Sequence, residues 1–121
     1  MENWLVEQLK AIRAFRVDAD GYDWFSYPDV VLEIVLDAPP TPEQTTAAIT
    51  ALTEFVNGYN KWHFLRPIHY VAEIGHIIKV KHPRGIYIHM DFGHSPATAL
   101  VAAVKSLEKT ELPIFRVTLQ W

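Results

Sequence analysis

The chain contains no cysteine. This absence excludes disulfide bonds, thiol nucleophiles, iron–sulfur clusters and zinc sites built on thiolates. Phosphate-binding loops are also missing, since the sequence contains neither a Gly-x-Gly-x-x-Gly motif nor a Gly-Lys pair followed by Ser or Thr. We therefore expect a fold that depends on packing and a protein that uses no cofactor.

Long hydrophobic runs are missing as well. Hydrophobic residues make up 50% of the 121 residues, but charged residues interrupt them well before the roughly 20 apolar positions that a membrane helix needs. The first residues, Met1 to Trp4, lack the basic start and apolar stretch of a secretory signal. These features predict one domain over residues 1–121, a cytoplasmic location and no membrane partner.

Positive charge is scarce in the first half of the chain. Residues 1–60 hold ten acidic and three basic side chains, whereas residues 61–121 hold four acidic and eight basic ones. The net charge of −3 argues against binding to nucleic acid. Arg84-Gly85 before an alternating segment is a feature of RNA-recognition domains, but Ile86 and Ile88 stand where their stacking aromatic residues belong. We expect no nucleic-acid partner.

Two kinds of pattern predict helices. Amphipathic spacing predicts an N-terminal helix over residues 3–16. Its buried side would consist of Leu5, Leu9, Ile12 and Phe15. Thr41-Pro42-Glu43-Gln44 combines a capping residue, a proline at the first helical position and Gln three residues after the cap, which predicts a second helix start. Ser95-Pro96 repeats the cap and proline and predicts a third.

Strand-like segments surround these helices. They are Asp29–Asp37, Ile68–Lys81, Ile86–Phe92 and Phe115–Trp121. The order over residues 29–121 is then β-α-β-β-α-β, which predicts an α+β, ferredoxin-like domain with an antiparallel sheet and two helices on one face. Many unrelated functions occur on this fold, so the fold alone does not indicate an activity.

Alternation along the strands predicts a polar sheet face opposite the helices. This face would carry Glu33, Tyr87, His89, Asp91 and Arg116. In the expected strand order the first and third strands are neighbours, which brings Glu33 near His89 and Asp91. A histidine beside a carboxylate can act as a general base, so these three residues are the catalytic candidates. His89, Asp91 and His94 together could also suit a metal ion, but their spacing matches no metal-site motif, and we predict no metal.

Five other residues are candidates for binding a partner. Tyr87 and Arg116 share the polar face, and His94 precedes the last predicted helix. Trp24 and Trp62 lie in connecting segments, where an exposed aromatic side chain often marks a binding surface.

The absence of catalytic motifs, together with a partly apolar open sheet face, favours a non-catalytic protein-interaction module. Such a face is readily covered by a second copy, so we expect a homodimer. A more specific form of this hypothesis is a bacterial immunity or antitoxin-like protein whose acidic half binds a basic toxin. The alternative is a small enzyme or ligand binder, without a bound cofactor, that uses His89, Asp91 and Glu33.

Overall fold

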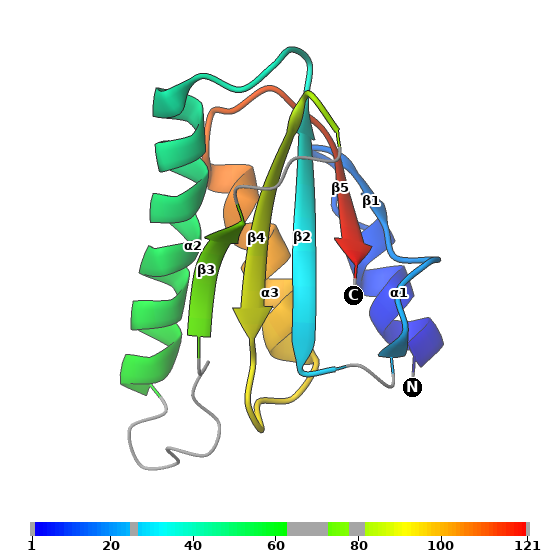
Figure 1. Ribbon diagram of the computed structural model, residues 1–121. Coiled ribbons are helices and arrows are strands. Elements are labelled where there is room, and N and C mark those ends of the chain that lie inside the picture. The colour runs from blue at the N-terminus through cyan, green and yellow to red at the C-terminus, as the bar shows by residue number, and fades with distance from the viewer. Residues whose placement is uncertain (1, 25–26, 63–72, 78–81, 121) are drawn as a thin grey trace.

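The computed structural model describes residues 2–24, 27–62, 73–77 and 82–120. In chain order the elements are α1 (Glu2–Lys10), β1 (Arg16–Asp18), β2 (Asp29–Leu36), α2 (Pro42–Trp62), β3 (Glu73–Ile77), β4 (Gly85–Asp91), α3 (Thr98–Ser106), the short 3-10 helix η3 (Leu107–Lys109) and β5 (Ile114–Gln120). The strands form one sheet, and the three α-helices lie on one of its faces (Figure 1). The α+β class that the sequence predicts is confirmed.

The sheet is mixed, with the strand order β1-β5-β2-β4-β3. Strands β5, β2, β4 and β3 pair antiparallel, but β1 pairs parallel to β5, with Val17 opposite Val117. The predicted β-α-β-β-α-β order over residues 29–121 is present in β2 to β5, but the prediction of a purely antiparallel, ferredoxin-like sheet is wrong, because β1 adds a parallel edge strand. Strand β1 has only three residues, Arg16–Asp18, and a segment this short shows no alternation that a sequence pattern can detect.

The N-terminal helix is shorter than the predicted span of residues 3–16, because α1 ends at Lys10. Ile12 and Phe15 are buried as expected, but from the connection that follows the helix. This connection brings Val17 into the sheet, where it joins the core. The helical spacing of apolar residues thus identified the buried side chains correctly but overestimated the length of the helix.

The start of α2 has the predicted capping box. The backbone N–H of Gln44 donates to Thr41 Oγ1 at 3.1 Å, and the Gln44 side chain accepts from the Thr41 backbone N–H at 3.0 Å. These two bonds satisfy donors that the first turn of a helix otherwise leaves unpaired.

The predicted cap at Ser95 is wrong. Helix α3 begins at Thr98, and its N-cap residue, Ala97, makes no side-chain hydrogen bond. Ser95 instead belongs to a tight turn: its backbone N–H donates to the Phe92 carbonyl at 2.9 Å, and its carbonyl accepts from the Tyr27 hydroxyl at 2.6 Å. Ser95 therefore belongs to the turn before α3 and does not cap the helix.

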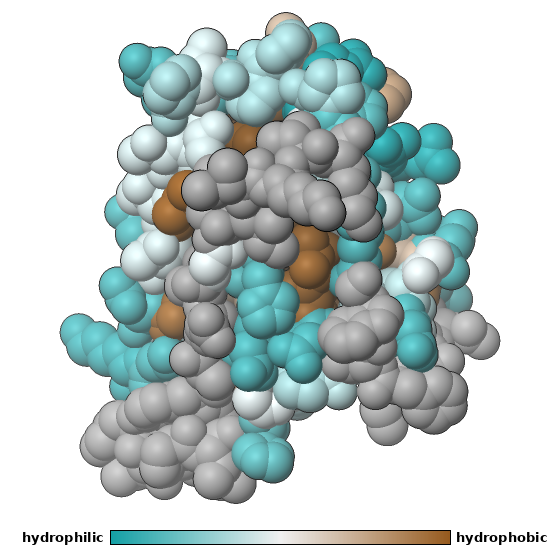
Figure 2. Space-filling model, in the orientation of Figure 1, coloured by the Kyte–Doolittle hydropathy of each residue, from teal (hydrophilic) through white to brown (hydrophobic). Residues whose placement is uncertain are grey.

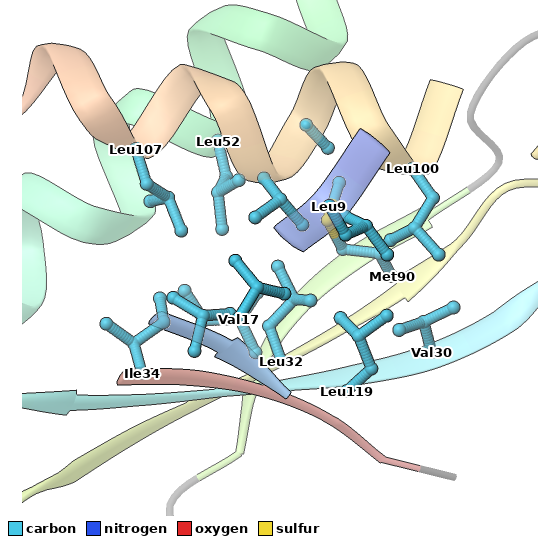
Figure 3. Packing of buried hydrophobic residues seen from close by; sticks show 14 of the residues in the cluster. Leu9, Val17, Val30, Leu32, Ile34, Leu52, Met90, Leu100, Leu107 and Leu119 are labelled. Atoms are coloured by element: carbon cyan, nitrogen blue, oxygen red, sulfur yellow. The ribbon is translucent and has the colours of Figure 1, made fainter. Parts of the chain in front are cut away.

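The core lies between the helices and the sheet (Figure 3). The labelled side chains from the strands, Val17, Val30, Leu32, Ile34, Met90 and Leu119, face those from the helices and η3, Leu9, Leu52, Leu100 and Leu107. Burying each such side chain contributes about 1.5–3 kcal/mol, so this layer supplies most of the stability. Among the described residues, no helix has the length and apolar character needed to span a membrane.

A bulge interrupts the pairing of β2 with β5. Val35 pairs with Arg116 and Leu36 with Ile114, so Phe115 has no opposing residue. Simple alternation with the buried Val117 and Leu119 would also bury Phe115, but Phe115 is 53% exposed. The extra residue changes the direction of the side chain, as bulges do.

Because of the bulge, we expect two truncations on β5 to lower the free energy of unfolding by different amounts. Phe115→Ala should lower the free energy of unfolding by less than about 1 kcal/mol, whereas Leu119→Ala, which opens a cavity in the core, should lower it by about 2–5 kcal/mol. Urea unfolding followed by circular dichroism measures both values. Equal losses would contradict the placement of Phe115 outside the core.

Candidate functional site

The sheet face turned away from the helices is the candidate site, and we call it the outer sheet face. Its side chains are Asp29, Val31, Glu33, Val35, Tyr87, His89, Asp91, Arg116, Thr118 and Gln120. Glu33 lies at its centre, because it pairs with Tyr87 on β4 and with Thr118 on β5. Figure 2 is viewed from this side, and between the grey atoms it shows hydrophilic residues beside hydrophobic ones.

Glu33 is a buried carboxylate, with only 7% of its surface exposed. The Tyr87 hydroxyl donates a hydrogen bond to its Oε2 at 2.5 Å. On the other side, Arg116 Nη2 lies 3.6 Å from Oε1. Burying a carboxylate is costly without such partners, so the neighbouring strands provide the groups that stabilise this charge.

Tyr87 is held in place by the turn that precedes β4. The Gly85 N–H donates to the His82 carbonyl at 2.9 Å and closes this turn. A Cβ at Gly85 would lie 2.9 Å from Tyr87 Cε2, so only glycine lets the ring pack here. The His82 N–H donates to the Tyr87 hydroxyl oxygen at 2.8 Å. The turn thereby directs the hydroxyl proton toward Glu33.

Two buried polar atoms on β5 have no hydrogen-bond partner among the described residues. They are Nε of Arg116 and Oγ1 of Thr118. Both belong to the outer sheet face, next to Glu33. Unpaired buried donors reduce stability, and in native proteins they often mark a place where a further group binds.

His89 forms a second pair on this face. Its Nε2 lies 3.2 Å from Asp29 Oδ1, and the two side chains are 33% and 41% exposed. Its carboxylate partner is therefore Asp29, which the sequence reasoning did not select, rather than Glu33 or Asp91. Asp29 is the first residue of β2 and lies diagonally opposite His89, because His89 pairs with Val31.

Asp91 has a structural contact of its own. Its Oδ1 accepts the backbone N–H of Gly93 at 2.9 Å, and Gly93 has a positive φ of 58°. A carboxylate that accepts a backbone N–H two residues later stabilises a turn. The three catalytic candidates are thus engaged separately: Glu33 with Tyr87 and Arg116, His89 with Asp29, and Asp91 with the turn after β4.

The pair of His89 and Asp29 can transfer a proton, since a carboxylate can orient an imidazole. In the part of the chain that the structure describes, no third catalytic group is hydrogen-bonded or ion-paired to these two side chains. Within the same residues, no group of three or more histidine and acidic side chains could hold a metal ion.

The remaining binding candidates lie apart from this face. His94 is exposed in the turn before α3. Trp24 is half-buried against the core, and its ring meets the edge of Tyr22 at a centroid distance of 4.9 Å. Trp62 is the last residue of α2, and its side chain lies outside the described part of the structure.

Two tyrosines join the lower end of the sheet to the neighbouring loops. The Tyr22 hydroxyl donates to the Asp29 carbonyl at 2.8 Å, and the Tyr27 hydroxyl donates to the Ser95 carbonyl. Burial raises the pKa of Tyr22 above its ordinary value, and the nearby Asp29 carboxylate adds to this effect. Burial is also the main cause of the raised pKa of Tyr27, to which the Asp91 carboxylate contributes. Aromatic composition alone did not reveal these contacts.

Comparisons with known proteins give no relative. No family model matches the chain, and neither the curated proteins nor the solved structures contain a match. The function is therefore inferred from the geometry of the outer sheet face.

Loss of the hydroxyl at Tyr87 should be costly because it removes a hydrogen bond from a buried carboxylate. Tyr87→Phe should lower the free energy of unfolding by about 1.5–3 kcal/mol. His89→Gln breaks the more exposed pair and should cost less than about 1 kcal/mol. Urea denaturation of both variants gives the comparison. A Tyr87→Phe cost no larger than that of His89→Gln would show that the buried contact does not stabilise the sheet.

The raised tyrosine pKa values predict a loss of stability at alkaline pH. In the unfolded chain both hydroxyls ionise near pH 10, while the folded protein still holds their protons. The free energy of unfolding should therefore fall above about pH 10, by about 1 kcal/mol for each tyrosine at pH 11. The Tyr22→Phe/Tyr27→Phe variant should show a flatter decline in denaturation experiments from pH 8 to 11. The same slope in both proteins would contradict the assignment.

Proposed function

We propose that this protein is a non-catalytic interaction module that self-associates through its outer sheet face. The observation that supports this proposal is the pairing of the acidic and basic groups within the face. Glu33 pairs with Arg116 and Asp29 with His89, whereas an active site needs its acids and bases to converge on a space for substrate.

The charge pattern of the face suits contact with a second copy. Each carboxylate has its cationic or polar partner beside it, so two copies of the face can meet without strong repulsion between like charges. A two-fold symmetric contact places the same patch on both partners and therefore requires this compatibility.

The apolar side chain available for such a contact is Val31, since Val35 on the same face is fully buried. Val31 is half-buried and lies between His89 on β4 and Gln120 on β5. A partly exposed valine with a polar side chain on each neighbouring strand resembles the apolar centre and polar rim of protein interfaces. The unpaired buried atoms of Arg116 and Thr118 lie on the same face.

Two narrower hypotheses from the sequence stay predictions. One is the immunity or antitoxin-like role, with a toxin as the partner. The other is the small enzyme or ligand binder, for which the pair of His89 and Asp29 now provides the histidine and carboxylate.

Sedimentation equilibrium tests the proposed self-association. The wild type should be a dimer, and Val31→Asp, which places an unpaired charge in the contact, should raise the dissociation constant at least about tenfold. Ala102→Asp adds the same charge to an exposed position of α3 on the helix side and serves as the control. It should leave the dimer unchanged.

Circular dichroism of both variants checks that they remain folded. A wild type that is monomeric at every accessible concentration would refute the proposal, as would a dimer that Val31→Asp and Ala102→Asp weaken equally.

A further inference from the structure

A groove of about 780 Å³ lies on the helix side of the molecule, away from the outer sheet face. It runs between the N-terminal half of α2 and the connection from α3 to β5, two segments that lie side by side in Figure 1. Its volume is within the range of binding sites for organic ligands and peptide side chains. None of its lining residues belongs to the outer sheet face.

The floor of the groove is apolar and its rim is acidic. Ala47, Ala51, Phe55 and Leu112 are partly buried and form the floor. The exposed charged residues of the rim are Glu43, Glu54, Glu111 and Lys109. None of these four charged groups has an ion-pair partner among the described residues. The rim therefore carries an excess of negative charge that no described cation neutralises.

Two hydroxyl groups add to the preference of the groove for a ligand with hydrogen-bond donors. Ser106 Oγ donates to the Ala103 carbonyl at 2.5 Å, and Thr110 Oγ1 donates to the Leu107 carbonyl at 2.7 Å. A hydroxyl has one proton to donate, so toward the groove both oxygens can only accept hydrogen bonds. The groove thus presents mainly acceptors and suits a ligand that is rich in positively charged donors.

The spacing of the carboxylates indicates an extended ligand. Glu43 and Glu54 are eleven positions apart on α2, which at about 1.5 Å per residue corresponds to about 16 Å. A single amine cannot reach both. A peptide segment several residues long can do so, with lysine or arginine side chains toward the rim and an apolar side chain on Phe55.

We propose that this groove binds a basic, partly apolar peptide segment of a partner protein. Binding would use the apolar floor for affinity and the acidic rim for selection and for faster association. Because the groove and the outer sheet face share no residue, this proposal does not depend on self-association.

The test uses the full chain and a short fluorescein-labelled peptide of alternating lysine and leucine, followed by fluorescence anisotropy. The wild type should bind this peptide more weakly as salt is raised, and it should not bind the same peptide with glutamate in place of lysine. Glu54→Gln/Glu111→Gln should raise the dissociation constant about three- to tenfold. Glu7→Gln/Glu108→Gln, which removes the same charge from exposed positions outside the groove, should leave it unchanged.

A further variant separates shape from charge. Ala51→Leu keeps every charge but fills the floor, and it should weaken peptide binding while circular dichroism stays unchanged. The proposal is overturned if the wild type does not bind the peptide, if the control pair weakens binding as much as the groove pair, or if Ala51→Leu has no effect. If spermine competes as well as the unlabelled peptide does, the groove binds a small polyamine and not a peptide segment. This result would also overturn the proposal.

Discussion

The carboxylate of Glu33 lies in the middle of the central strand, buried by its neighbours. A charge in this position requires partners, and they come from both adjacent strands: the hydroxyl of Tyr87 on β4 and the guanidinium of Arg116 on β5. The contact therefore fixes how the three central strands align. A shift of either pairing by one residue would move its partner to the other face of the sheet and leave the carboxylate buried alone.

The same constraint extends to the turn before β4. Tyr87 reaches Glu33 only because Gly85 leaves room for its ring and the His82 N–H holds its oxygen. The polar side chains at the centre of the outer sheet face are therefore ordered by the fold itself. A surface whose acidic side chains already have partners loses little on binding a second protein, which supports the proposal that this face serves association rather than catalysis.

The sequence predicted what depends on local chemistry. The capping box of Thr41 and Gln44 and the pairing of Glu33 with the strand that carries Tyr87 and His89 follow from short patterns and alternation. It did not predict β1, the exposure of Phe115 or the partner of His89. Those depend on tertiary contacts: a three-residue strand pairs only because β5 is present, a bulge changes one side chain's direction, and Asp29 reaches His89 diagonally across two strands.

Isotope-filtered NMR on a mixture of labelled and unlabelled protein tests the central claim most directly, because it detects contacts between copies residue by residue. The account predicts intermolecular NOEs from the methyl groups of Val31 to protons of the outer sheet face of the second copy. Intermolecular NOEs confined to the helix side, or none from Val31, would contradict it.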